Sequence, residues 1–147
     1  MNHTCSVSIN KPIAHVWKLW TEPSHIVCWN FAHESWCCPS ATNDLVIGGK
    51  FSYRMEAKDK SFGFDFSGVY EFIELNRRII YALDDQRKVE ITFIEADGVT
   101  TINEVFESEN QHSGEVQRQG WQAILDNFKQ YAESEVFSEV ALGTLLK

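Results

Sequence analysis

The sequence has no long hydrophobic run and no cluster of basic residues. None of its apolar stretches approaches the roughly 20 residues that a membrane-spanning helix needs, and the opening MNHTCSVSINKP lacks the basic and then apolar order of a secretory signal. The longest basic group is Arg77 and Arg78, with Arg87 and Lys88 nearby, in a chain of formal net charge -8. This charge balance repels phosphate backbones and anionic lipid surfaces. We therefore expect a soluble, cytoplasmic protein that binds neither nucleic acid nor membranes.

Catalytic motifs are also missing. The chain contains no GxSxG nucleophile elbow, no HExxH pair and no glycine-rich phosphate loop. The adjacent Asp84 and Asp85 are typical of a solvated turn rather than of an acid/base pair. We therefore expect no cofactor and favour a role other than catalysis, which leaves His33 and Glu90 as candidates for proton transfer if the protein is an enzyme after all.

One segment, HIVCWNFAHESWCCP, is rich in side chains that can bind metals. It contains His25, Cys28, His33, Cys37 and Cys38. A structural zinc ion takes four such ligands in a tetrahedron, but the spacing here matches no paired CxxC or HxxxH arrangement. A zinc site is therefore the lesser alternative, and we predict no bound metal. Without a secretory signal, the cysteines are predicted to be reduced thiols rather than a disulfide framework.

The composition is that of a folded domain, and the first third of the chain mixes strand and helix. Hydrophobic residues make up 44% and aromatic residues 13% of the 147 positions, which is enough for the core of one domain. Alternation over residues 3–10 predicts a strand. Pro12 suits the first turn of a helix, Pro23 ends that helix, and a second short helix is predicted at residues 24–29. Residues 31–43 are irregular and are predicted to form a loop across the body.

Strands dominate the middle of the sequence. The segment DLVIGGKFSYRMEAK predicts a short strand, a Gly-Gly turn or bulge, and a second strand with Phe51, Tyr53 and Met55 on one face. The next strand, FGFDFSGVYEFI, is long, and Gly68 is predicted to mark a bulge in it. RIIYAL, KVEITFIE and VTTINEVFE follow as three more strands with short turns. This succession is typical of an antiparallel meander.

A long amphipathic helix is predicted at residues 114–134, because apolar side chains recur there at spacings of three to five. They are Val116, Trp121, Ile124, Leu125, Phe128 and Tyr131. Gly120 inside this helix costs roughly 1 kcal/mol relative to alanine. Close approach of the helix to the sheet would explain a glycine there, and so would the wall of a pocket.

The order of these elements predicts a two-layer α+β domain. If the sheet is strongly curved, a helix that lies across its concave side cannot touch every strand, and the gap is a pocket. We expect a single domain over residues 1–134 and a C-terminal tail over residues 135–147. The tail is predicted either to pack on the body or to contact a second copy of the chain in a homodimer.

Three blocks of sequence resemble a known family. They are INKPIAHVWKLWTEPSHIVCW, NDLVIGGKFSYRMEAKDKSFGFDFSGVY and GWQAILDNFKQYAE, which are spread over the length of residues 5–134. The chain resembles the START-like, birch-pollen-allergen-type superfamily, also called SRPBCC, and within it the homologues of the C-terminal domain of the activator of heat-shock protein 90 ATPase. The resemblance implies a helix-grip fold, in which a long C-terminal helix clasps a curved antiparallel sheet of about six to seven strands over a cavity. Members of the superfamily include lipid and hormone carriers, polyketide cyclases and aromatases.

The first functional hypothesis is a protein that binds a small hydrophobic or aromatic molecule between the sheet and the C-terminal helix. Its predicted ligand-binding residues are Tyr53, Met55, Phe66, Tyr81, Trp121, Leu125 and Phe128. One alternative is a chaperone-associated stress-response module that contacts a heat-shock protein. The other is a cyclase-like enzyme that uses His33 or Glu90 for proton transfer.

Polar side chains aimed inward would distinguish a pocket from a packed core, because aromatic residues fill both. The candidates for such inward-facing polar side chains are Arg54, Tyr81, Glu90, Thr101 and Asn103. Strand alternation leaves open which of them face the helix.

Overall fold

The computed structural model describes residues 2–134, so the predicted tail of residues 135–147 and its proposed contacts lie outside the described residues. The elements follow the predicted order of a strand, two short helices, further strands and a long helix. They are β1 (Asn2–Ile9), α1 (Ile13–Thr21), α2 (Pro23–Ile26), β2 (Trp36–Asn43), β3 (Lys50–Ala57), β4 (Gly63–Glu74), β5 (Arg78–Leu83), β6 (Lys88–Ala96), β7 (Val99–Glu107) and α3 (Gly114–Glu133).

The strands form one antiparallel sheet in the order β1-β7-β6-β5-β4-β3-β2. From β2 to β7, each strand pairs with the next one along the chain, because short turns connect them. These turns place Lys60, Asn76, Gln86 and Asp97 in the left-handed region, with φ values of 66°, 64°, 76° and 53°. β1 pairs with β7 at the opposite edge from β2. The predicted meander is therefore confirmed.

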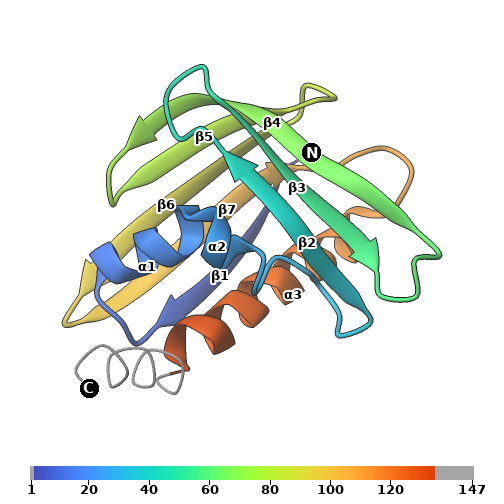
Figure 1. Cartoon of the computed structure of the whole chain (residues 1–147). Helices are drawn as coiled ribbons and strands as arrows, with labels where there is room; N and C mark the ends of the chain where they lie inside the picture. Colours follow the sequence, from blue (N-terminus) through green and yellow to red (C-terminus); the bar gives the residue numbers. More distant parts are fainter. Residues whose placement is uncertain (1, 135–147) are drawn as a thin grey trace.

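Two irregularities bend this sheet. The register shifts in β2 between Cys37 and Ser40, and in β4 between Tyr70 and Phe72. An extra residue on one strand increases the local twist. Pro39 is tolerated at the first shift because β2 is an edge strand, where a missing N–H breaks no central ladder. The sheet curls into a half-barrel around α3, as Figure 1 shows, which confirms the predicted helix-grip arrangement.

The long helix is fixed at its start and along its length. The Ser113 hydroxyl accepts a hydrogen bond from the Val116 N–H at 3.1 Å, which caps the first turn of α3. Gln122 Nε2 donates to the Ser6 carbonyl at 3.0 Å, so the helix is tied to the edge strand β1. The short helices bridge two parts of the sheet: α1 contacts the interior strands β6 and β7, and α2 contacts the edge strand β2. They lie against one end of the half-barrel only (Figure 1).

Two of the predicted elements differ from the structure. Part of the predicted loop, residues 36–43, is the edge strand β2, which pairs with β3 across the bulge. Residues 44–49, predicted to begin with a short strand, form turns instead. Gly48 there has φ of 85°, and its N–H donates to the Tyr70 carbonyl at 2.8 Å. In both segments, long-range backbone pairing decides the conformation rather than local alternation.

Two residues have a different role from the predicted one. The bulge in β4 follows Tyr70, two residues beyond Gly68. Gly68 instead permits close packing, because a Cβ there would lie 2.4 Å from the Ala82 carbonyl oxygen. Val116, predicted on the apolar face of the last helix, is 57% exposed. The buried face of α3 therefore begins further along the helix than the apolar pattern suggests.

Candidate functional site

A cavity of about 760 Å³ lies between the concave face of the sheet and the N-terminal half of α3. Its walls come from the strands β2, β3, β4, β5 and β7, from the end of α1, from the segment between α2 and β2, and from residues that precede α3. Pockets that hold small molecules typically measure about 300–1,000 Å³ and are mostly apolar. The cavity is therefore large enough for a molecule of several rings.

Aromatic side chains form most of the inner wall. Trp121 of α3 stacks on Phe106 of β7, with ring centroids 4.3 Å apart and planes at 6°. Trp121 also contacts Phe66 of β4 edge to face, with ring centroids 5.8 Å apart. Phe66 in turn lies 6.3 Å from Tyr53 of β3 and 6.4 Å from Tyr81 of β5. Such pairs hold one another in place, so the wall has a defined shape.

Exposed aromatic residues surround part of the opening. Phe62, just before β4, is 65% exposed, and Phe64, within β4, is 42% exposed. Both rings lie close to Trp36 of β2, at centroid distances of 6.0 and 6.1 Å. His33 also lines the cavity, and its Nδ1 lies 2.8 Å from the Ser35 hydroxyl. A molecule entering the cavity would therefore first meet apolar surface.

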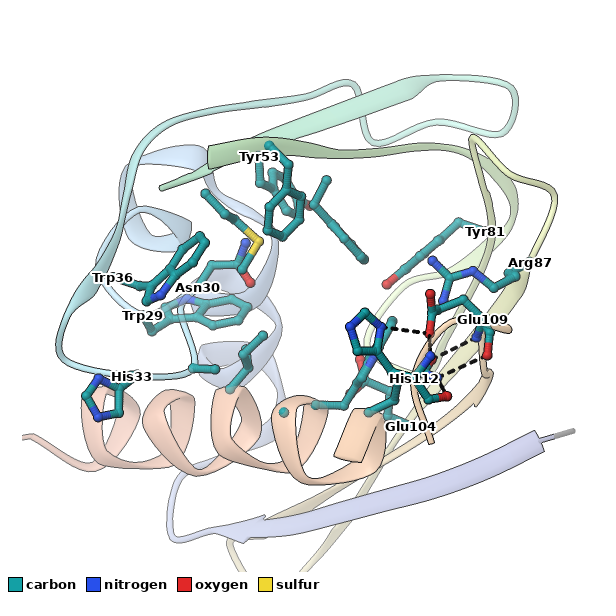
Figure 2. A pocket seen from close by; sticks show the side chains of 18 of the residues that line it. Trp29, Asn30, His33, Trp36, Tyr53, Tyr81, Arg87, Glu104, Glu109 and His112 are labelled. Carbon is teal, nitrogen blue, oxygen red and sulfur yellow. Dashed lines mark hydrogen bonds and ion pairs between the residues drawn. The ribbon is translucent and has the colours of Figure 1, made fainter. Parts of the chain in front are cut away.

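Polar side chains gather at one end of the cavity. Figure 2 shows Tyr81, Arg87, Glu104, Glu109 and His112 on one side of it. Glu109 Oε1 lies 3.1 Å from His112 Nδ1 near the surface. Arg87 Nε donates a hydrogen bond to Asp85 Oδ2, in the same turn, at 2.7 Å. The Glu104 carboxyl group is almost fully buried, and no ion pair or hydrogen bond engages it within residues 2–134.

Burial determines the charge state at this end. Glu104 is 5% exposed, and the loss of hydration raises the pKa of its carboxyl group to about 8. Burial also raises the pKa of the Tyr81 phenol well above its usual value, and the nearby Glu104 adds to that shift. Both groups are therefore mainly protonated at neutral pH. A protonated carboxyl group is a hydrogen-bond donor.

Glu104 faces the cavity because of its place in β7. Along this strand Thr100, Ile102, Glu104 and Phe106 are buried and alternate with more exposed residues. The Cα partners of Glu104 on the flanking strands are Cys5 and Ile91. Sequence analysis missed Glu104, yet the signal was present: it occupies the alternate position between two apolar residues that face the core.

Hydrogen bonds fix the wall opposite α3. The Tyr70 hydroxyl donates to Asn43 Oδ1 at 2.5 Å, and Asn43 Nδ2 donates to the Thr21 carbonyl at 2.7 Å. This chain of contacts links β4, β2 and the end of α1. Burial raises the pKa of Tyr70 and, well above the usual value, that of Tyr53. These hydroxyl groups therefore stay neutral over the physiological range.

The structure brings together five of the seven predicted ligand-binding residues. The cavity is lined by Tyr53, Met55, Phe66, Tyr81 and Trp121. Leu125 and Phe128 are fully buried and belong to the core beside the cavity rather than to its lining. Whether the lining residues bind a ligand stays a prediction.

The two candidates for proton transfer are separated by the sheet. His33 lies at the cavity, as described above. Glu90 points to the outer face of β6, where it pairs with Arg78 at 2.5 Å. Of the other polar candidates, Arg54 is outside the lining and contacts Asp65 at 3.4 Å, and β7 turns Thr101 and Asn103 away from its buried face.

Gly120 forms part of the cavity wall, although it is in the interior of α3. A Cβ at this position would have no atom within 4 Å. Close packing of the helix on the sheet, one of the two explanations that the sequence suggested, is therefore wrong. Gly120 widens the cavity at the cost of helix propensity.

The cysteine- and histidine-rich segment is dispersed. Within residues 2–134, no group of three or more His, Cys, Asp or Glu side chains could hold a metal ion. His25 Nδ1 lies 2.7 Å from the Tyr131 hydroxyl, and Cys38 donates to the Ser40 carbonyl at 3.5 Å. The four cysteines are free. Over the same residues, no helix is long and apolar enough to cross a membrane.

The curled sheet, the clasping helix and the cavity between them define a START-like helix-grip domain. The chain belongs to the family described as Activator of Hsp90 ATPase homolog 1-like protein, whose profile matches residues 10–133. Among curated proteins, none matches the chain significantly.

Solved structures agree with this assignment. The chain is 40% identical to the AHSA1-like protein from Aeromonas hydrophila, with a TM-score of 0.86 over 91% of this chain and 93% of that one. It is 44% identical to a protein from Cytophaga hutchinsonii, with a TM-score of 0.78 over 90% and 92% of the two chains. A protein from Chromobacterium violaceum, 20% identical, shares the fold with a TM-score of 0.80 over 90% and 98%.

Proposed function

We propose that this protein binds a small hydrophobic or aromatic molecule in the cavity between the sheet and α3. The observation that carries the proposal is the cavity of about 760 Å³, with its wall of paired aromatic rings. Burial of apolar ligand surface yields about 25 cal/mol per Å², so the wall could supply the affinity. The free cysteines agree with a cytoplasmic setting, which we propose as well.

Gly120 offers a direct test, because a side chain added there would occupy the cavity without first disturbing the core. The probe is N-phenyl-1-naphthylamine, whose fluorescence rises in apolar surroundings. We expect the wild-type protein to bind it and Gly120→Leu to bind at least about tenfold more weakly, since the added side chain fills space that the probe needs. Gly120→Ala is the matched control and should retain binding.

Three results would count against the proposal. They are the absence of probe binding by the wild type, equal binding by Gly120→Leu and the wild type, and an equal loss in Gly120→Ala. Thermal unfolding of each variant checks that it is folded. Native mass spectrometry of the purified wild type, compared with its denatured mass, adds a second readout, because a retained molecule would appear as an adduct.

A second candidate function follows from the family, whose description names an activator of Hsp90 ATPase. In this alternative the chain contacts an Hsp90-type chaperone through its acidic surface, in keeping with the net charge of -8. ATPase assays of such a chaperone with and without this chain separate the two functions. Stimulation that is unchanged in Gly120→Leu would favour the surface contact, whereas an inert chain would leave the cavity as the functional site.

A further inference from the structure

Within the described part of the chain, the Glu104 carboxyl group is a buried polar group without a partner. It is 5% exposed, it lines the cavity, and burial alone accounts for its altered acidity, with no hydrogen bond or ion pair from residues 2–134. Buried hydrogen-bonding groups are nearly always paired, because leaving one unpaired is unfavourable. An orphan group that faces a cavity therefore indicates that the occupant supplies the partner.

Within residues 2–134, none of the titratable groups around Glu104 forms an ion pair with it, and burial alone shifts its pKa. Cys5 faces Glu104 from β1, and burial raises its pKa to about 11. Tyr81 faces it from β5, and Arg87, in the turn after β5, and His112, before α3, line the same cavity. Arg118 of α3 acts on Cys5. His3 lies on the same face of β1 as Cys5, with its ring 5.6 Å from that of Phe106.

Three of the basic side chains at this end are paired with carboxylates other than Glu104. The pairs are Arg87 with Asp85 at 2.7 Å, Arg118 with Glu115 at 2.8 Å and His112 with Glu109 at 3.1 Å. A carboxyl group without an ion partner in apolar surroundings favours its neutral form, which donates a hydrogen bond. The complementary ligand atom is then a neutral oxygen acceptor.

We propose that Glu104 donates a hydrogen bond from its carboxyl group to a carbonyl oxygen of the bound molecule, so that the ligand is a neutral aromatic ketone, quinone or similar carbonyl compound. This inference rests on the proposed function, because it names the class of ligand for the same cavity. A ligand amine would instead require Glu104 to be ionised, and a ligand carboxylate would require a free cation where Arg87 and His112 are already paired.

Three probes with the same two-ring body test the ligand class. They are benzophenone, diphenylmethane and aminodiphenylmethane, which carry a carbonyl group, no polar group and an amine. Titration calorimetry at pH 7 should give the highest affinity for benzophenone, roughly tenfold above diphenylmethane, the usual effect of one hydrogen bond. Equal affinity of these two probes, or the highest affinity for the amine, would overturn the inference.

Two substitutions locate the effect at Glu104. Glu104→Gln keeps a hydrogen-bond donor of the same shape and should retain the preference for benzophenone. Glu104→Met removes the donor, keeps the unbranched shape and should bind benzophenone and diphenylmethane equally. Retention of the preference in Glu104→Met would overturn the inference. Failure of all three probes to bind the wild type would contradict the proposed function and this inference together, whereas tight binding of diphenylmethane alone would contradict only the inference.

The pH dependence gives a readout that a merely structural role would not produce. Between pH 6.5 and 9.5 the preference for benzophenone should fall in the wild type as the donor is lost, and it should stay constant in Glu104→Gln. His112→Gln, which alters a second titratable group at this end, should still show the fall. A preference that is independent of pH in the wild type, or that changes equally in Glu104→Gln, would contradict the assignment.

Discussion

The two halves of α3 face the same sheet, but one half is packed against the core and the other borders a cavity. In the C-terminal half, Leu125, Phe128 and Ala132 are at most 1% exposed and are packed in the core. In the N-terminal half, Gly120 and Trp121 line a cavity. The same helix therefore closes one end of the half-barrel and leaves the other end open.

The difference comes from what lies between the helix and the sheet. At the closed end, α1 and the segment after α2 supply Trp20 and Trp29, whose rings lie 5.0 and 4.7 Å from Phe128. Towards the open end these two tryptophans form part of the cavity wall. The largest helix side chain there, Trp121, stacks flat on Phe106 instead of filling the gap. A helix-grip fold thus obtains a cavity by placing its short helices at one end of the sheet.

The largest expected effect is the cost of truncating the closed end. Phe128→Ala should lower the free energy of unfolding by about 3–5 kcal/mol, because the surrounding rings cannot collapse into the space. Trp121→Ala should cost about 1–2 kcal/mol, because solvent already has access to the cavity beside it. Urea denaturation of both variants measures the difference. Equal losses would mean that the open end is as tightly packed as the closed one.

The second effect concerns the pH dependence of stability. The pKa of Glu104 is raised to about 8 in the folded protein, against an ordinary value of 4.5. Between these values the unfolded chain loses its proton while the folded chain keeps it, so the wild type should become less stable as pH rises from 4.5 to 8. The decrease amounts to a few kcal/mol, since one pKa unit corresponds to about 1.4 kcal/mol.

Glu104→Gln is the control for this effect, because it cannot ionise. The difference in unfolding free energy between variant and wild type, measured in urea at pH 4.5, 6 and 8, should grow with pH in favour of the variant. A difference that stays constant would show that Glu104 titrates alike in the folded and unfolded chains. The burial of Glu104 beside the cavity would then have no effect on its acidity.

Most of the fold could be predicted, because alternation within each central strand shows which of its side chains face the core. Strict alternation marks β5, β6 and β7, and the turns between them are short. The strand β2 could not be found in this way, because the bulge around Pro39 breaks its alternation and its pairing with β3 is long-range. Backbone pairing of this kind leaves little trace in a single segment.

The site was harder to predict than the fold. Helical spacing identifies the apolar face of α3, but it cannot separate Trp121, which reaches the cavity, from Phe128, which is covered by α1 and the segment after α2. Among the polar residues of β7, the sequence suggests Thr101 and Asn103 as candidates for the pocket. The structure instead places Glu104 on the buried face, together with Ile102. A charged residue between apolar positions is easily taken for an exposed one, because acidic side chains are rarely buried without a partner.

The smallest expected effect is a gain in stability at the open end. Gly120→Ala should raise the free energy of unfolding by about 1 kcal/mol, because alanine favours the helix and its Cβ would meet no atom within 4 Å. Gly68→Ala is the matched control, since the same methyl group would lie 2.4 Å from the Ala82 carbonyl and 3.0 Å from the Phe51 ring. It should destabilise the sheet. If urea denaturation showed Gly120→Ala to be destabilised as well, the helix would be packed closely there, and the open end would be no more open than the closed one.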